Sequence, residues 1–156
     1  ATMYEGWKRD PQLFVEWFEY NYYEVDEENM QVDKDLLYPG NKEYHPLKCC
    51  IMPQTLNNLL ANSKKHYTRD DSIITRKLNT ELPLGVRYDK GREKFFSQIT
   101  MEGETITLGY WDSPEDAFVE YKSHKQAYIL MMADRYKNKI PKHIYDALLK
   151  VEVLPY

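Results

Sequence analysis

Residues 85–135 constrain the fold more than any other stretch, because the spacing of their apolar residues changes along the chain. Alternation predicts strands over 94–99 and 104–108, with a tight turn at Gly103 between them, and a shorter strand over 85–88. Ser113, Pro114 and Asp116 then form a helix start: an N-cap, a proline in the first turn and an acid. The stretch therefore predicts a three-stranded antiparallel sheet followed by one long helix.

Apolar side chains recur at three- and four-residue steps along the predicted helix and form one face. The positions on this face are Ala117, Phe118, Tyr121, His124, Tyr128, Met131 and Met132. Three strands cannot bury an apolar face alone, so we expect the helix to cover the sheet face that carries Ile99, Ile106 and Leu108. The opposite sheet face is predicted to stay open. It carries Arg87, Lys94, Phe96, Gln98, Thr105 and Thr107, with Lys90 and Arg92 in the first hairpin.

This stretch resembles the APETALA2-type DNA-binding domain of plant ethylene-response factors and of phage endonucleases and integrases. The motifs that carry the resemblance are GVR at 85–87, KFFSQI at 94–99, LG at 108–109 and a helix start of the form D-x-P-E-x-A at 112–117, with Tyr121 one turn later. In that family the open sheet face lies in the DNA major groove. The resemblance implies contacts to double-stranded DNA from Arg87, Gln98, Thr105 and Thr107, and we add Lys90, Arg92 and Lys94 because they are basic and lie on or beside the same face. Threonine stands here at positions where the plant domains use arginine and tryptophan, and it contacts bases more weakly than arginine does.

The charge of the chain is unevenly distributed along its 156 residues. The net charge of −4 divides into −6 over 1–63, +2 over 64–110 and zero over 111–156. Positive charge is therefore concentrated where the open face is predicted, although a solvated mixed surface would give the same balance. No apolar run approaches the roughly 20 residues of a membrane helix. The adjacent cysteines Cys49 and Cys50 favour a reduced, cytoplasmic setting over a disulfide framework.

The N-terminal part of the chain opens with a predicted aromatic helix. Asp10 and Pro11 form its start, and its inward stripe is Leu13, Phe14, Trp17 and Phe18. The acidic run over 24–28 that follows has two interpretations. It is a solvated loop, or it belongs to an acidic surface that imitates a phosphate backbone and binds a protein partner.

Residues 32–60 predict a strand, a loop, a returning strand and a short helix, which together make a ββα module. The strands are expected over 32–37 and 48–52, and the helix begins at Pro53 with Leu56, Leu59 and Leu60 inward. A metal finger of this layout holds a divalent ion between the first strand and the helix, and a nearby imidazole activates water for attack on phosphate.

The same stretch resembles the His-Asn-His nucleases, in the variant that phages fuse to an APETALA2-type domain. The matching motifs are Asp33-Lys34-Asp35, then G-N-K-x-Y-x-P-x-x-C over 40–49, then P-x-x-x-N over 53–57. The resemblance implies Asp33 and Asn57 as ligands of Mg²⁺, Asn41 as the residue that holds the loop, and His45 as a substitute base. Active nucleases carry a histidine where this chain has Lys34, and a lysine is protonated at neutral pH. The resemblance also suggests that the sequence begins partway through the family's N-terminal region.

The sequence thus predicts an α+β chain in three parts: an N-terminal helix with a degenerate ββα module over 1–62, a basic linker over 63–84, and a DNA-binding domain with a short C-terminal helix over 85–156. The leading interpretation is a phage-type protein that binds double-stranded DNA through the sheet. One alternative is a metal-dependent endonuclease of the homing type. The other is an interaction protein or inhibitor that acts through its acidic N-terminal half. No membrane partner is expected.

Overall fold

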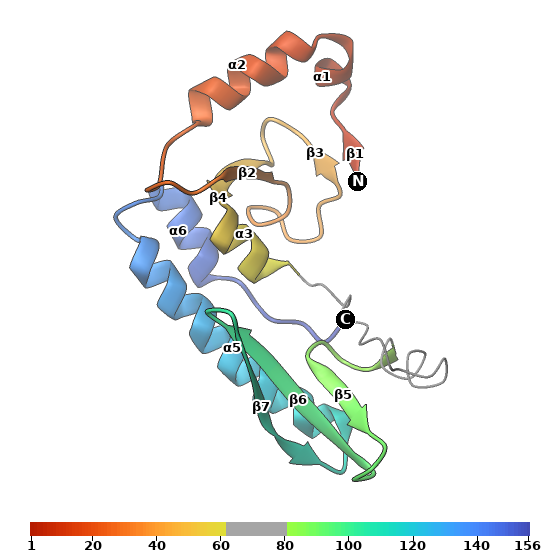
Figure 1. Ribbon diagram of the computed structural model, residues 1–156. Helices are drawn as coiled ribbons and strands as arrows, with labels where there is room; N and C mark the ends of the chain where they lie inside the picture. Colours follow the sequence, from red (N-terminus) through yellow and green to blue (C-terminus); the bar gives the residue numbers. More distant parts are fainter. Residues whose placement is uncertain (62–80) are drawn as a thin grey trace. The chain divides into compact units, whose positions relative to one another are not determined.

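The computed structural model describes residues 1–61 and 81–156, which divide into two compact units (Figure 1). Unit 1 comprises residues 1–61 and 129–151, and the described residues of unit 2 are 81–128 and 152–156. Most of the predicted linker over 63–84 lies outside the described residues. Residues 129–151, which the sequence assigned to the C-terminal domain, group with the N-terminal residues instead. Within unit 1 the Tyr136 hydroxyl donates to Glu28, and Lys139 pairs with Asp26 at 2.8 Å.

Unit 2 contains a three-stranded antiparallel sheet in the order β5-β6-β7, as predicted. The strands are β5 (Val86–Asp89), β6 (Lys94–Met101) and β7 (Glu104–Trp111). The turn between β6 and β7 contains Glu102 with φ 51° and Gly103 with φ 84°. Two consecutive residues of positive φ are the geometry of the tight hairpin turn that matches strand twist.

One long helix, α5 (Pro114–Tyr136), packs against this sheet, which confirms the predicted cover. The Ser113 hydroxyl accepts the N–H of Asp116 at 3.1 Å, so the predicted N-cap is present. Ala117 is fully buried with Leu82 and Val86, and four partly buried aromatic side chains pack against them: Tyr88, Phe95, Trp111 and Phe118. The predicted apolar stripe was wrong at His124 and Met131, which are exposed. The buried face of the helix passes instead through Tyr128, Ile129 and Met132.

A β-bulge interrupts the pairing of β6 with β7. Ser97 pairs with Gly109 and Gln98 pairs with Thr107, so Leu108 is an extra residue without a partner on β6. Ile106 lies opposite the buried Ile99. The extra residue lets Gly109 and Trp111 continue on the helix-covered face, whereas simple alternation had assigned Leu108 to that face. It also places Tyr110 on the opposite face.

Unit 1 contains the strand–loop–strand–helix order that the sequence predicted, with shorter strands. β2 (Met30–Asp33) pairs antiparallel with β4 (Cys50–Pro53), and α3 (Gln54–Leu60) follows at once, with Leu56 and Leu59 buried. The prediction of a strand over 32–37 was wrong beyond Asp33, because the Asp33 carboxylate accepts the backbone N–H groups of Asp35 and Leu36 and turns the chain there.

The remaining elements of unit 1 come from both ends of its sequence. β1 (Thr2–Met3) pairs in parallel with β3 (Glu43–Tyr44), and the helices are α1 (Glu5–Arg9), α2 (Pro11–Asn21) and α6 (Lys142–Leu149). Asp10 caps α2 as predicted, by accepting the Gln12 N–H at 3.1 Å. The aromatic stripe of α2 is only partly buried and Leu13 is exposed, whereas Trp7 of α1, 5.0 Å from Phe14, is buried. Within the two described ranges, no helix is long and apolar enough to cross a membrane.

Candidate nucleic-acid interface and polar loop

The face of the β5–β7 sheet that points away from α5 is called the open face. Its members, identified from the strand pairing and the alternation of side chains, are Arg87, Asp89, Lys94, Phe96, Gln98, Thr100, Thr105, Thr107 and Tyr110. The middle of this face is a row across all three strands, in which Arg87 lies opposite Phe96 and Phe96 lies opposite Tyr110. The Phe96 and Tyr110 rings are 5.7 Å apart between centroids. An aromatic centre is thus flanked by polar and basic groups.

The basic side chains of the open face are gathered near the β5–β6 hairpin, and two of them are paired with acids. Lys94 forms an ion pair with Asp112, just beyond the end of β7. Arg92 forms an ion pair with Asp89 at 2.8 Å and lies over the Tyr110 ring, with its guanidinium carbon 4.6 Å from the ring centroid. Lys90 is exposed in the hairpin itself. The positive potential of this end is therefore reduced by the two aspartates.

Toward the β6–β7 turn the open face is neutral. The Gln98 amide donates to the Thr107 hydroxyl at 3.2 Å, and the hydroxyls of Thr100 and Thr105 are 2.9 Å apart. These cross-strand bonds hold the side chains in fixed positions above the sheet. All seven predicted DNA-binding residues are thus on the open face or in the hairpin beside it.

Four residues of this surface were missed by the sequence reasoning, the first of them Thr100, which lies beyond the predicted strand end at Ile99. Tyr110 was missed because the third strand was expected to end at Leu108, and the bulge that extends it is not visible in a simple alternation. Asp89 and Asp112 were missed as partners of Arg92 and Lys94. The D-x-x-R spacing of 89–92 is a signal for the first pair, since a hairpin brings such residues together, but nothing local predicts a pair 18 residues apart.

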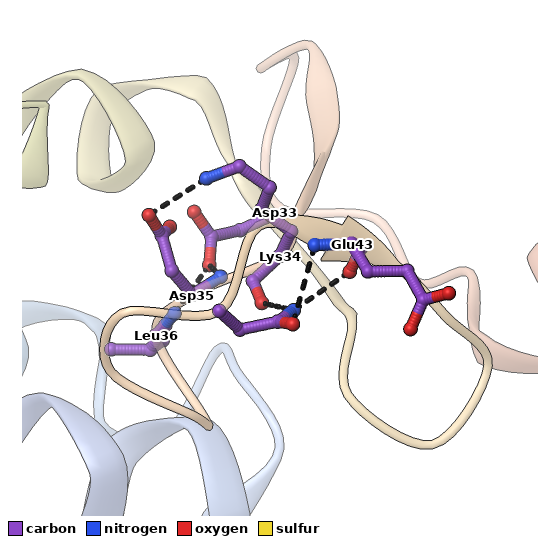
Figure 2. A network of polar contacts seen from close by, with 6 residues as sticks. Asp33, Lys34, Asp35, Leu36 and Glu43 are labelled. Carbon is purple, nitrogen blue, oxygen red and sulfur yellow. Dashed lines mark hydrogen bonds and ion pairs between the residues drawn. The ribbon is translucent and has the colours of Figure 1, made fainter. Parts of the chain in front are cut away.

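The second candidate site is the polar loop over 33–43 in unit 1, shown in Figure 2. The Asn41 side chain donates to the backbone carbonyls of Lys34 at 2.6 Å and Glu43 at 2.7 Å, and its oxygen accepts the Glu43 N–H at 3.2 Å. One amide therefore joins the two ends of the loop. This is the loop-holding position that the sequence assigned to Asn41.

Asp33 is held by the backbone at the point where β2 ends. One of its carboxylate oxygens accepts the N–H of Leu36 at 2.7 Å and that of Asp35 at 3.0 Å. Burial raises the pKa of Asp33 above its ordinary value, and the nearby Asp35 charge adds to this, while the two N–H groups act in the opposite direction. Lys34 forms an ion pair with Asp35, with 2.8 Å between Nζ and Oδ2 (Figure 2).

The structure places Asn57 on the same side of β2 as Asp33. Asn57 of α3 donates to the Gln31 side chain at 2.6 Å, and Gln31 and Asp33 are two residues apart on one strand, so their side chains share a face. His45 is used differently. Its Nδ1 accepts the Leu47 N–H at 3.1 Å and its ring lies 4.6 Å from that of Tyr4. With Nδ1 accepting, the proton of the neutral ring is on Nε2, which makes that nitrogen a donor and not a base.

These residues fit a magnesium ion poorly. Mg²⁺ is bound through one or two carboxylates, and the single strand carboxylate here has a raised pKa and already accepts two N–H groups. Over residues 1–61 and 81–156, no group of three or more His, Cys, Asp or Glu side chains is arranged to hold a metal ion. Cys49 and Cys50 are free and buried, and the Cys49 sulfur accepts the His45 N–H at 3.2 Å. Both are buried, packed side chains.

Comparison with protein-family models, with curated proteins and with solved structures gives no significant match to this chain. A function is therefore inferred from the two sites described above.

Proposed function

We propose that this protein binds double-stranded DNA through the open face of the β5–β7 sheet. The observation that carries the proposal is the row of Arg87, Phe96 and Tyr110. This row combines basic and aromatic groups on the sheet face that α5 does not cover. A surface of this kind can contact phosphates with its cations while polar side chains reach base edges. The family resemblance of this stretch supports the same assignment.

The ββα module acts in this proposal as a scaffold and not as a nuclease. Lys34 stands at the position of the catalytic histidine and is paired with Asp35, which raises its pKa and keeps it protonated. His45 has its acceptor nitrogen occupied. The module therefore lacks a poised base for activating water. The endonuclease alternative, with Mg²⁺ on Asp33 and Asn57, requires a rearrangement of this loop.

The third interpretation, a protein partner for the acidic N-terminal half, has less support. Two acids of the 24–28 run are used inside unit 1: Glu28 accepts from Tyr136 and from Thr55, and Asp26 pairs with Lys139. A pull-down in the presence of added nuclease tests this interpretation, because a partner bridged by DNA would be lost.

DNA binding is tested by replacing two cations of the open face. The Arg87→Ala/Lys94→Ala variant should bind a duplex more weakly, and the slope of log K against log salt should fall by roughly 2, since each lost phosphate contact removes about 0.9. A matched control is Lys122→Ala/Lys142→Ala, which removes the same charge from helices and also breaks two ion pairs, with Glu152 and Asp146. Equal slopes for the sheet variant and the wild type would contradict the proposal.

The scaffold role of the ββα module is tested by gel electrophoresis of plasmid DNA. Plasmid DNA is incubated with the protein and Mg²⁺, and separately with Mn²⁺, with Asp33→Ala alongside. We expect a mobility shift without nicking. Nicking that Asp33→Ala abolishes would establish the endonuclease alternative.

A further inference from the structure

Three cations, Lys90, Arg92 and Lys94, lie in or beside the β5–β6 hairpin, and they differ in how they are held. Lys90 is exposed in the hairpin, and the Lys94 charge is matched by Asp112. Arg92 is restrained in two ways: by its ion pair with Asp89 and by its position over the Tyr110 ring. The quadrupole of an aromatic ring attracts a cation that lies over its face, so this contact restrains the guanidinium.

Asp89 is itself fixed by the hairpin that it begins. One carboxylate oxygen accepts the backbone N–H groups of Gly91 at 2.9 Å and Arg92 at 3.0 Å, and the other accepts Nη1 of the Arg92 side chain at 2.8 Å. The hydrogen bonds from Arg92 lower the pKa of Asp89, and its backbone N–H contributes more than its guanidinium. Asp89 is therefore ionised at neutral pH. The carboxylate therefore acts as a rigid support for the guanidinium.

Tyr110 supplies the second support. It is paired across β6 with Phe96, and the two rings are tilted by 39°. Its ring lies on the open face because the bulge at Leu108 shifts the alternation of β7. Despite both restraints the Arg92 side chain is 61% exposed, so its guanidinium is held in place while still reaching solvent.

A guanidinium held by one nitrogen keeps donors for a second, bidentate contact. Arginine has five N–H donors in a planar fork, and the major-groove edge of guanine presents two acceptors, O6 and N7, that match this fork. Fixing the side chain beforehand lowers the conformational entropy lost on binding. The amide and threonine hydroxyls of the open face already bond to one another across the strands, so they are less suited to this contact.

We propose that Arg92 is the base-reading residue of the open face, that its ligand is the major-groove edge of a guanine in double-stranded DNA, and that Asp89 is its positioning residue. The inference rests on the proposed function, because it requires the open face to enter the major groove. It adds a sequence preference and assigns it to a single hairpin.

The test measures discrimination at one atom of guanine. A preferred duplex is first selected from a random pool with the wild-type protein. Binding is then measured by fluorescence anisotropy for this duplex and for copies in which one guanine at a time is 7-deazaguanine, which lacks the N7 acceptor but still pairs with cytosine. At one guanine we expect the wild type to lose roughly 10-fold in affinity.

Two variants assign that loss to Arg92 and Asp89. Arg92→Lys keeps the charge and loses the fork, and Asp89→Asn keeps an acceptor for the turn and loses the anionic support. Both should bind the two duplexes with nearly equal affinity, so that the 10-fold ratio disappears. The control Lys90→Gln removes a cation of the same hairpin and should weaken binding to both duplexes while leaving the ratio intact. If Asp89→Asn does not fold, Arg92→Lys carries the test.

The outcomes separate this inference from the proposed function. Duplex binding that is insensitive to 7-deazaguanine at every position, or a ratio that survives Arg92→Lys, would overturn the reading role of Arg92 and leave the interface intact. A ratio that is lost in Arg92→Lys but kept in Asp89→Asn would overturn the positioning role. Absence of duplex binding by the wild type would overturn both the inference and the proposed function.

Discussion

At the scale of single residues, the Asn41 side chain satisfies three backbone groups of the polar loop. Its amide nitrogen bonds to two carbonyls and its oxygen accepts one N–H. Asn41→Ala should lower the free energy of unfolding by about 1–3 kcal/mol, the range for leaving partly buried polar groups unsatisfied. Asn41→Asp should be no better, because a carboxylate cannot donate to the carbonyls. Urea denaturation measures both, with the exposed Asn58→Ala as the control, which should be near wild type. An Asn41→Asp variant as stable as wild type would contradict the donor role.

Asp33 gives the polar loop a predictable dependence on pH. Its folded-state pKa is raised, chiefly by burial, so the folded protein holds this proton more tightly than the unfolded chain does. Asp33 therefore costs stability above its raised pKa, and that cost disappears as the pH falls toward the ordinary aspartate value of about 3.9. Asp33→Asn keeps an oxygen for the two N–H groups and removes the charge.

We expect the Asp33→Asn variant to be more stable than the wild type, with the largest difference near pH 7. This difference should shrink as the pH falls. Urea titrations at a series of pH values measure the difference. An advantage that grows as the pH falls would mean that the Asp33 charge is stabilised in the fold, for example by Lys34.

The residues that sequence reasoning located correctly act over short distances along the chain. The caps at Asp10 and Ser113 and the Asn41 bonds within the loop each join groups fewer than ten positions apart. The pairing of Lys94 with Asp112 depends on the register of two strands. It could not be read from spacing, because register is fixed by the packed sheet as a whole.

At the scale of elements, the junction between β5 and α5 depends on one glycine. Gly85 has φ +74°, and a Cβ built on it would lie 2.2 Å from the Tyr121 ring. Gly85→Ala should therefore cost at least about 2 kcal/mol, from the left-handed backbone and from the overlap with the ring. Gly103→Ala is a matched control: its φ is +84° but nothing lies within 4 Å of its Cβ position.

The control separates the two contributions of Gly85. Gly103→Ala should cost only the backbone term, about 1–2 kcal/mol. Thermal or urea unfolding of both variants gives the comparison. Equal losses in the two would mean that the Tyr121 ring moves aside at no cost, and that the close contact at Gly85 does not fix the position of α5 on the sheet.

Element types were predictable from the sequence where one face is buried and its alternation is regular. β5, β6 and the start of α5 fall where the periodicity predicted them. The end of β7 was missed because a bulge adds one residue and reverses the alternation after it. β2 was expected to continue to Leu37, whereas the Asp33 side chain bonds to the backbone and ends the strand there.

At the scale of the whole molecule, unit 1 is assembled from segments at distant positions in the sequence. Its second segment over 129–151 contributes six buried apolar side chains: Ile129, Met132, Ala133, Ile140, Ile144 and Leu148. Burying a side chain such as Ile144 or Leu148 stabilises a fold by about 1.5–3 kcal/mol, while a whole domain is stable by only about 5–15 kcal/mol. Sequence reasoning placed the boundary wrongly for this segment because the helical pattern of α5 runs without interruption from one unit into the other.

The ββα module should therefore not fold from residues 1–61 alone. We expect this fragment to show no cooperative thermal transition by circular dichroism, and to regain one when a separate peptide of residues 113–156 is added, because that peptide restores the buried side chains and the Tyr136 partner of Glu28. The full-length Tyr136→Phe variant is the control. It loses only that hydrogen bond, at a cost of roughly 0.5–3 kcal/mol, and should still unfold cooperatively. A cooperative transition in the isolated 1–61 fragment would show that the module has a sufficient core of its own, and that residues 129–151 are bound to it without being required by it.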